Sequence, residues 1–158
     1  MDEQASIQMR AIGEVETNVA NDDIARQRRT IVSRINIYDE FVPALEGLNN
    51  YSHIIVLFWM HHAQPSTEPL IRPRGNIGLP LTGVLASRGR GHPNPIGLAV
   101  TELVELSGSQ LTVHRLDAYN GTPIIDIKPY DSYDVYTDIR MPTWFAKRAA
   151  AAPLAQTK

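Results

Sequence analysis

The sequence contains no cysteine, no long hydrophobic run and little excess charge of either sign. Without cysteine, disulfides, thiolate zinc sites and cysteine nucleophiles are excluded. The longest apolar run, Ile54 to Met60, is much shorter than the roughly 20 residues that a membrane-spanning helix needs, so we expect no membrane segment. The first residues are acidic and polar, which is not typical of a secretory signal. We therefore expect a cytoplasmic protein.

Common catalytic motifs are also missing. The sequence has no HExxH zinc motif, no GxSxG nucleophile turn, no GxxxxGK[ST] phosphate loop and no GxGxxG turn opening a helix. His61 and His62 are adjacent, and on a strand they would point to opposite faces. The other three histidines lack ligand spacing, so we expect no metal site.

The formal net charge of −2 gives no general attraction to nucleic acid, but the arginines are clustered. The clusters are Arg26, Arg28, Arg29 and Arg34; Arg72 and Arg74; and Arg88 and Arg90, next to His92. They are compatible with a basic face that binds nucleic acid, and equally with solvated loops whose arginines pair with scattered carboxylates.

With 158 residues the chain has an ordinary length for one domain, which we place at residues 1–145, followed by a tail at 146–158. Apolar patterning predicts seven extended segments: Ile7 to Val15, Ile31 to Ile37, Ser52 to His61, Leu81 to Ser87, Ile96 to Leu106, Leu111 to Leu116 and Pro123 to Lys128. Helical patterning is scarce, with short candidates at Asp39 to Leu48 and Pro142 to Ala152. Many short strands and few helices predict a mainly all-β fold, an antiparallel barrel or sandwich with short helical segments.

The segment from His92 to Gly97 (HPNPIG) contains two prolines, which fix the backbone and remove two hydrogen-bond donors. It therefore cannot be an interior strand and must form a rigid loop. The second proline holds Asn94 extended, which would aim its amide at a ligand or at neighbouring backbone. A structural turn and a binding loop both remain open.

A second unusual segment runs from Asp117 to Tyr130 (DAYNGTPIIDIKPY). Its Asn-Gly pair indicates a turn, which by itself would be a tight hairpin. Asp126 and Lys128 then alternate with isoleucines, so they share one side of a strand, either as a surface ion pair or as reactive groups. Tyr130 adds an aromatic ring where the strand ends.

Together these segments resemble the TsaA-like family, which includes tRNA N6-threonylcarbamoyladenosine methyltransferases. The similarity runs from about Ile12 to Trp144, and its most specific parts are PNPIG and GTPxxDIKPY in this order. The resemblance implies a small antiparallel β-barrel of about seven strands that forms a homodimer, binds S-adenosylmethionine near the subunit interface and methylates adenosine in the anticodon loop of tRNA.

The resemblance also implies site residues. The predicted cofactor-binding residues are Arg26, Gln27, His61, His62, Arg88, Asn94, Leu116, Asp117, Ala118 and Tyr119. The predicted catalytic residues are Asp126, Lys128 and Tyr130. In this interpretation Asp126 accepts the proton lost from N6, and Lys128 holds the threonyl carboxylate or a phosphate.

The sequence departs from the family pattern at two places. Where the family has a threonine-arginine-serine-proline run leading to an arginine, this chain has Ser87 to His92 (SRGRGH), which replaces a permanently charged guanidinium by an imidazole. Because the sequence ends soon after Trp144, we also expect no counterpart of the additional C-terminal domain that some longer members have. Two alternatives therefore accompany the tRNA methyltransferase hypothesis: a relative that methylates another substrate, and a non-catalytic module that binds S-adenosylmethionine.

Overall fold

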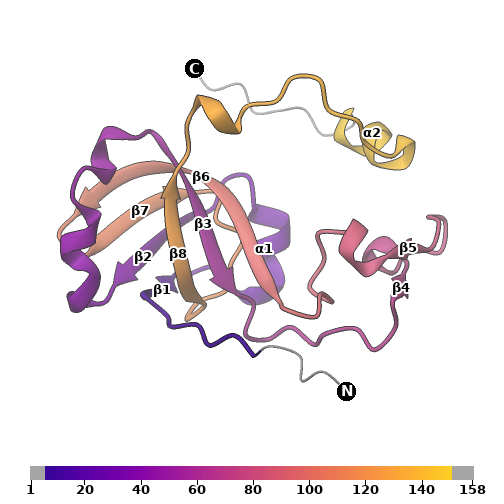
Figure 1. The fold of residues 1–158 in the computed structure, drawn as a ribbon, viewed down its shortest axis with the longest axis horizontal. Helices are drawn as coiled ribbons and strands as arrows, with labels where there is room; N and C mark the ends of the chain where they lie inside the picture. The colour runs from indigo at the N-terminus through magenta and orange to yellow at the C-terminus, as the bar shows by residue number, and fades with distance from the viewer. Residues whose placement is uncertain (1–5, 151–158) are drawn as a thin grey trace.

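Six antiparallel strands form a small closed barrel in a computed structural model that describes residues 6–150, with side chains through residue 146 (Figure 1). The barrel strands are β1 (Gly13–Glu16), β2 (Val32–Ile37), β3 (His53–Trp59), β6 (Ile96–Ser107), β7 (Gln110–His114) and β8 (Pro123–Pro129). Their order around the barrel is β1-β2-β7-β6-β3-β8, and β8 pairs with β1 to close it. The predicted antiparallel barrel is confirmed, with six strands in place of about seven.

The remaining elements lie outside the barrel wall. Strands β4 (Leu70–Ile71) and β5 (Thr82–Gly83) form a separate ribbon, which Figure 1 shows beside the barrel. The helices are α1 (Asn21–Gln27), α2 (Thr143–Ala150) and five 3-10 turns, namely η1 (Asp39–Leu45), η2 (Leu48–Asn50), η3 (Pro73–Gly75), η4 (Val84–Ala86) and η5 (Ser132–Asp134). None of the helices described is long and apolar enough to cross a membrane.

The two predicted helical segments are helical in the structure. Residues Asp39 to Leu48 form η1 and the start of η2, and α2 lies within Pro142 to Ala152. Helix α2 also runs across the predicted boundary between residues 145 and 146, and residues 151–158 of the predicted tail lie outside the described range. Helix α1 was not predicted, because a helix of seven residues with one buried side chain, Ile24, shows no apolar periodicity.

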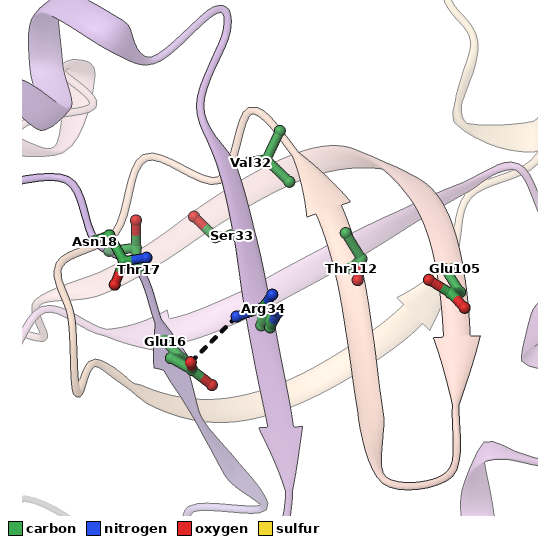
Figure 2. A pocket seen from close by; sticks show the side chains of 8 residues that line it. All are labelled: Glu16, Thr17, Asn18, Val32, Ser33, Arg34, Glu105 and Thr112. Atoms are coloured by element: carbon green, nitrogen blue, oxygen red, sulfur yellow. Dashed lines mark hydrogen bonds and ion pairs between the residues drawn. The ribbon is translucent and has the colours of Figure 1, made fainter.

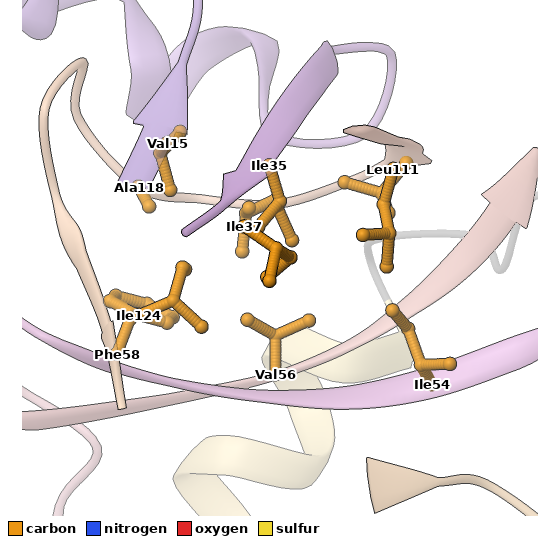
Figure 3. Close-up of a cluster of buried hydrophobic side chains, with 11 residues drawn as sticks. Val15, Ile35, Ile37, Ile54, Val56, Phe58, Leu111, Ala118 and Ile124 are labelled. Carbon is orange, nitrogen blue, oxygen red and sulfur yellow. The ribbon is translucent and has the colours of Figure 1, made fainter. Parts of the chain in front are cut away.

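The core fills the inside of the barrel through alternation along each strand. On β2 and the residue before it, Ile31, Ser33, Ile35 and Ile37 are all buried, as the period-2 pattern predicts. Figure 3 shows how the inward side chains meet. The core cluster consists of Val15, Ile35, Ile37, Ile54, Val56, Phe58, Leu111, Val113, Leu116, Ala118 and Ile124.

Two predicted strands are wrong in whole or in part. Residues Ile7 to Ile12 are not a strand, because β2 ends at Ile37 opposite Gly13 and leaves them no partner on that side; Ile7 is 80% exposed. Residues Leu81 to Ser87 form only the short β5 and the turn η4, and Leu85 is exposed. A segment of alternating apolar residues forms a strand only where a neighbouring strand is available to pair with it.

Candidate functional site

Four of the predicted cofactor segments meet at one end of the barrel, which we call the cofactor end. It contains α1, the turn at residues 61–62 after β3, the loop at residues 87–95 before β6, and the connection at residues 115–122 between β7 and β8. The strand register brings them together. Trp59 at the end of β3 lies opposite Ile96, Phe58 lies opposite Ile124, and Val32 after α1 lies opposite His114.

His61, His62 and Tyr119 form an aromatic cluster at the cofactor end. The two imidazole centroids are 3.9 Å apart, and the rings of His62 and Tyr119 are 6.0 Å apart. The prediction that the two histidines face opposite sides of a strand is wrong, because β3 ends at Trp59 and both histidines lie in the turn that follows. Arg90 donates a hydrogen bond of 3.0 Å to the Tyr119 hydroxyl, which ties the loop before β6 to this cluster.

The pKa of the His61 imidazole is lowered, which favours the neutral form. Partial burial lowers the pKa of His61, the neighbouring His62 lowers it further, and a hydrogen bond with the Trp59 backbone opposes both. A neutral ring is compatible with a cationic ligand beside it. Among the described residues, no group of three or more His, Asp or Glu side chains is placed to hold a metal ion.

The loop before β6 is anchored by its backbone. The Pro95 carbonyl accepts a hydrogen bond of 2.8 Å from the Met60 amide, and His92 Nε2 lies 2.9 Å from the Ser87 carbonyl. Arg88 donates to the Leu98 carbonyl at 3.3 Å. The Asn94 side chain is exposed and has no partner among residues 6–146, so a rigid turn presents a free amide. The anchored backbone agrees with the interpretation as a structural turn, and a binding role for Asn94 stays a prediction.

The connection between β7 and β8 crosses the cofactor end. These strands are not neighbours in the barrel, so the tight-hairpin interpretation of the Asn-Gly turn is wrong. Leu116 and Ala118 point into the core, and only their backbone is available to a cofactor. Asp117 is exposed and Tyr119 is half-buried, so these two offer side chains.

Helix α1 contributes the remaining pair of predicted cofactor residues. Arg26 forms an ion pair with Asp23, and its side chain is 78% exposed. Gln27 is exposed, and its carbonyl accepts hydrogen bonds from the Thr30 and Ile31 amides that end the helix. Both side chains are accessible.

The predicted catalytic residues lie away from this cluster in a single chain. A register shift on β8 places Asp126 opposite Leu57 and Lys128 opposite Ile55, on the outer wall of the barrel. Lys128 Nζ is 2.8 Å from Asp126 Oδ2, so the two form the surface ion pair that the sequence left open.

Tyr130 lies still farther from the aromatic cluster. Its ring is 6.3 Å from that of His53, the first residue of β3, whereas His61 lies two residues beyond the last residue of that strand. A strand of this length spans about 20 Å. One chain therefore does not bring Tyr130 to the cofactor end.

A polar groove on another part of the outer wall contains none of the predicted residues (Figure 2). Glu16 accepts hydrogen bonds from Asn36 at 2.9 Å and from Arg34 at 3.3 Å. The Asn36 bond, followed by the Arg34 charge, lowers the pKa of Glu16. Glu16 and Arg34 therefore pair with each other within this groove, which also contains Glu105.

The sequence matches the family described as the tRNA-methyltransferase O N-terminal domain over residues 20–135. The chain belongs to this family. Among its relatives is a probable S-adenosyl-L-methionine-binding protein of Methanocaldococcus jannaschii, 43% identical over 97 residues, which are 60% of this chain and 77% of the relative. The rat tRNA (adenine(37)-N6)-methyltransferase is 30% identical over 131 residues, which are 82% of this chain and 30% of the relative.

Solved structures of tRNA-methyltransferase O have the same fold. The protein from Pseudomonas aeruginosa matches with a TM-score of 0.72 and 28% sequence identity over 91% of this chain. The match covers 64% of that chain, so this protein spans less than two thirds of the solved structure. The predicted family and barrel are confirmed.

Proposed function

We propose that this chain is an S-adenosylmethionine-dependent methyltransferase that methylates N6 of threonylcarbamoyl-adenosine in the anticodon loop of tRNA. The observation that carries the proposal is the meeting of four predicted cofactor segments at one barrel end, in a chain of the tRNA-methyltransferase O family. The names of the relatives, S-adenosyl-L-methionine-binding proteins and a tRNA methyltransferase, support the cofactor and the substrate class. A cytoplasmic location stays a prediction.

The side chains at the cofactor end suit S-adenosylmethionine chemically. The adenine needs an aromatic plane, which His62 and Tyr119 offer. The amino-acid carboxylate needs a cation, and Arg26 and Arg88 are both exposed there. Asp117 is exposed and has no partner among the described side chains, so it is available to the ribose hydroxyls or the ammonium group.

The bound cofactor would supply an activated methyl group on a sulfonium, so the chain has mainly to position the N6 nucleophile and take up its proton. Asp126 is the candidate acceptor of that proton, and Lys128 is the candidate partner of the threonyl carboxylate or of a phosphate. Lys128 Nζ and Asp126 Oδ2 lie 2.8 Å apart, so the two candidate groups stand side by side on the barrel wall.

We infer that Asp126 and Lys128 reach the cofactor of a second copy of the chain, and the outer wall around them is suited to hold one. In register beside them lie Ile55 and Leu57 on β3, then Val100 and Leu98 on β6, and Trp59 and Ile96 complete the patch. We call these six apolar residues the apolar wall. Leu98 is 49% exposed and Val100 43%, which is unusual for adjacent apolar side chains in a monomer.

A substitution in the apolar wall tests the homodimer. Val100→Glu places a charge in the apolar wall opposite Ile55 and should convert a dimer to a monomer in light scattering, with loss of methyl transfer. Val104→Glu is the matched control, because Val104 is 51% exposed on the same strand, toward the end of β6 that is away from the cofactor end. A wild-type protein that is monomeric and fully active would refute a shared site.

Mass spectrometry of tRNA nucleosides tests the reaction. In a deletion strain, methylated threonylcarbamoyl-adenosine should disappear, return with the wild-type chain and fail to return with Asp126→Ala. Asp134→Ala is a matched control, because Asp134 is an exposed carboxylate outside the barrel wall. An unchanged nucleoside profile in the deletion strain would overturn the proposed substrate.

Two alternative functions are separated by the same experiments. A methyltransferase for another substrate would bind S-adenosylmethionine without changing this nucleoside. A regulatory module would bind the cofactor and transfer no methyl group to bulk RNA or protein. The archaeal relatives are named only for S-adenosyl-L-methionine binding, which agrees with the regulatory module as well as with an enzyme.

A further inference from the structure

Arg115 has a backbone conformation that arginine seldom adopts. Within residues 6–150, Arg115 and Arg74 are the non-glycine residues with positive φ, at 68° and 57°. This left-handed conformation is strained for arginine, because its Cβ crowds the following carbonyl oxygen. Strained backbone is concentrated at functional positions, and Arg115 lies directly before the predicted cofactor residues 116–119.

The fold explains why residue 115 has a left-handed backbone conformation, but not why this residue is an arginine. Val113 on β7 points inward, and the next inward residues are Leu116 and Ala118, so the alternation shifts by one position at Arg115. A left-handed residue there returns the chain to the core. Glycine or asparagine would provide the same turn with less strain, so the turn alone does not account for an arginine at this position.

Arg115 has both acidic and basic residues near it, and His114, directly before it, is 3.1 Å from Glu102 Oε2. Its amide donates a hydrogen bond of 2.9 Å to the Ile31 carbonyl, which holds it against the connection between α1 and β2 that carries Arg28 and Arg29. The nearest acid along its own connection is Asp117, which is also exposed. The Arg115 side chain is exposed and makes no ion pair or hydrogen bond with another described residue.

We propose that Arg115 binds a phosphate of the RNA substrate at the rim of the cofactor end, with Arg28 extending the same basic patch. The inference rests on the proposed tRNA substrate and names residues that would hold its backbone. A guanidinium can bind phosphate through two parallel hydrogen bonds, and an uncommitted one has no ion pair to break. The fixed main chain limits where the side chain reaches, so the contact positions the RNA without reading its sequence.

Arg115→Asn separates this role from a structural one. Asparagine tolerates the left-handed backbone, so the variant should melt at or above the wild-type temperature. Its affinity for RNA should fall about 3–10-fold at moderate salt, and the slope of log K against log salt should decrease by about 0.7–0.9. Arg115→Lys keeps the charge and should retain most of that slope.

Filter binding is measured with two RNA probes, an unmodified tRNA transcript and a short single-stranded RNA. The control is Arg10→Asn, which removes the same charge from an exposed arginine that already pairs with Glu40. It should leave the salt slope unchanged. S-adenosylmethionine affinity is measured in parallel and should stay within about twofold for Arg115→Asn, because the variant keeps the path of the backbone.

Each outcome decides a different claim. If the wild-type chain binds both RNAs and Arg115→Asn leaves the slope of log K against log salt unchanged, the phosphate contact is overturned and the proposed function is unaffected. Loss of cofactor affinity in Arg115→Asn also overturns it, because the residue would then act through the cofactor loop. Binding to the short RNA but not to tRNA, with the expected loss in Arg115→Asn, supports the contact and overturns the tRNA substrate. A wild-type chain that binds neither RNA overturns both.

Discussion

Gly97 lies where the β6 backbone passes over the ring of Phe58, and Gly97→Ala tests how closely the core and the cofactor end are coupled. A Cβ built on Gly97 would lie 2.2 Å from Phe58 Cε2 and 2.3 Å from Cζ. Gly97 pairs with Phe58 across β6 and β3, and both are buried. The ring must therefore move, and it lies three residues before His61.

The expected magnitude follows from overpacking. Forcing an extra methyl into a packed core typically costs about 1–3 kcal/mol. For a chain of this size each kcal/mol lowers the melting temperature by about 2–4 °C. Thermal unfolding and urea titration measure the change, and S-adenosylmethionine affinity should fall along with stability because β3 leads directly into the histidine turn.

A double-mutant cycle gives the control. Phe58→Leu provides space, so the double variant should be more stable than the sum of the single changes by about 0.5–3 kcal/mol. Gly83→Ala is the matched glycine control, because a Cβ there has no atom within 4 Å, and it should leave stability nearly unchanged. A Gly97→Ala protein as stable as wild type, or strict additivity with Phe58→Leu, would refute the reasoning.

Three further predictions concern buried polarity, pH and the aromatic cluster. Thr101 is fully buried and its Oγ1 has no partner, so Thr101→Val should raise the free energy of unfolding by about 1 kcal/mol in urea; a lower value would mean that the hydroxyl is bonded. The pKa of His61 is lowered from 6.5 in the folded state. The stability of the fold that depends on a neutral His61 is therefore fully present above pH 6.5 and is lost as pH falls through the folded pKa. Stability measured from pH 7 to 5 should therefore fall less steeply in His61→Asn than in wild type, and parallel profiles would contradict this. Tyr119→Phe removes the acceptor of the Arg90 hydrogen bond and should weaken S-adenosylmethionine binding about 3–10-fold in calorimetry. An unchanged affinity would mean that this hydrogen bond does not contribute to cofactor binding.

The barrel was predictable because its strands follow simple physical rules. The alternation of Ile31 to Ile37 and the apolar run in β3 are determined by which side chains the core buries. Local patterns could not reveal the pairing order, and so Leu81 to Ser87 was predicted as a strand although it has no place in the barrel. Pairing depends on partners that are distant in sequence.

The site was predictable in part, and mainly through the family resemblance. Its motifs selected the segments that meet at the cofactor end, but could not show that Leu116 and Ala118 turn inward or that His61 and His62 stack in a turn. Arg115 was not among the predicted residues, because what distinguishes it is a positive φ angle. That angle arises where the inward-facing positions shift by one residue after β7. No residue pattern marks such a shift.

The central claim is that S-adenosylmethionine binds at the aromatic cluster of the cofactor end. Calorimetric titration of S-adenosylmethionine into the full chain tests this claim most directly. The wild-type chain should bind saturably, and His62→Ala should weaken binding by tenfold or more, since it removes the ring between His61 and Tyr119. Arg34→Ala, in the polar groove, should bind like wild type. No binding by wild type at millimolar cofactor, or equal binding by wild type and His62→Ala, would contradict the account.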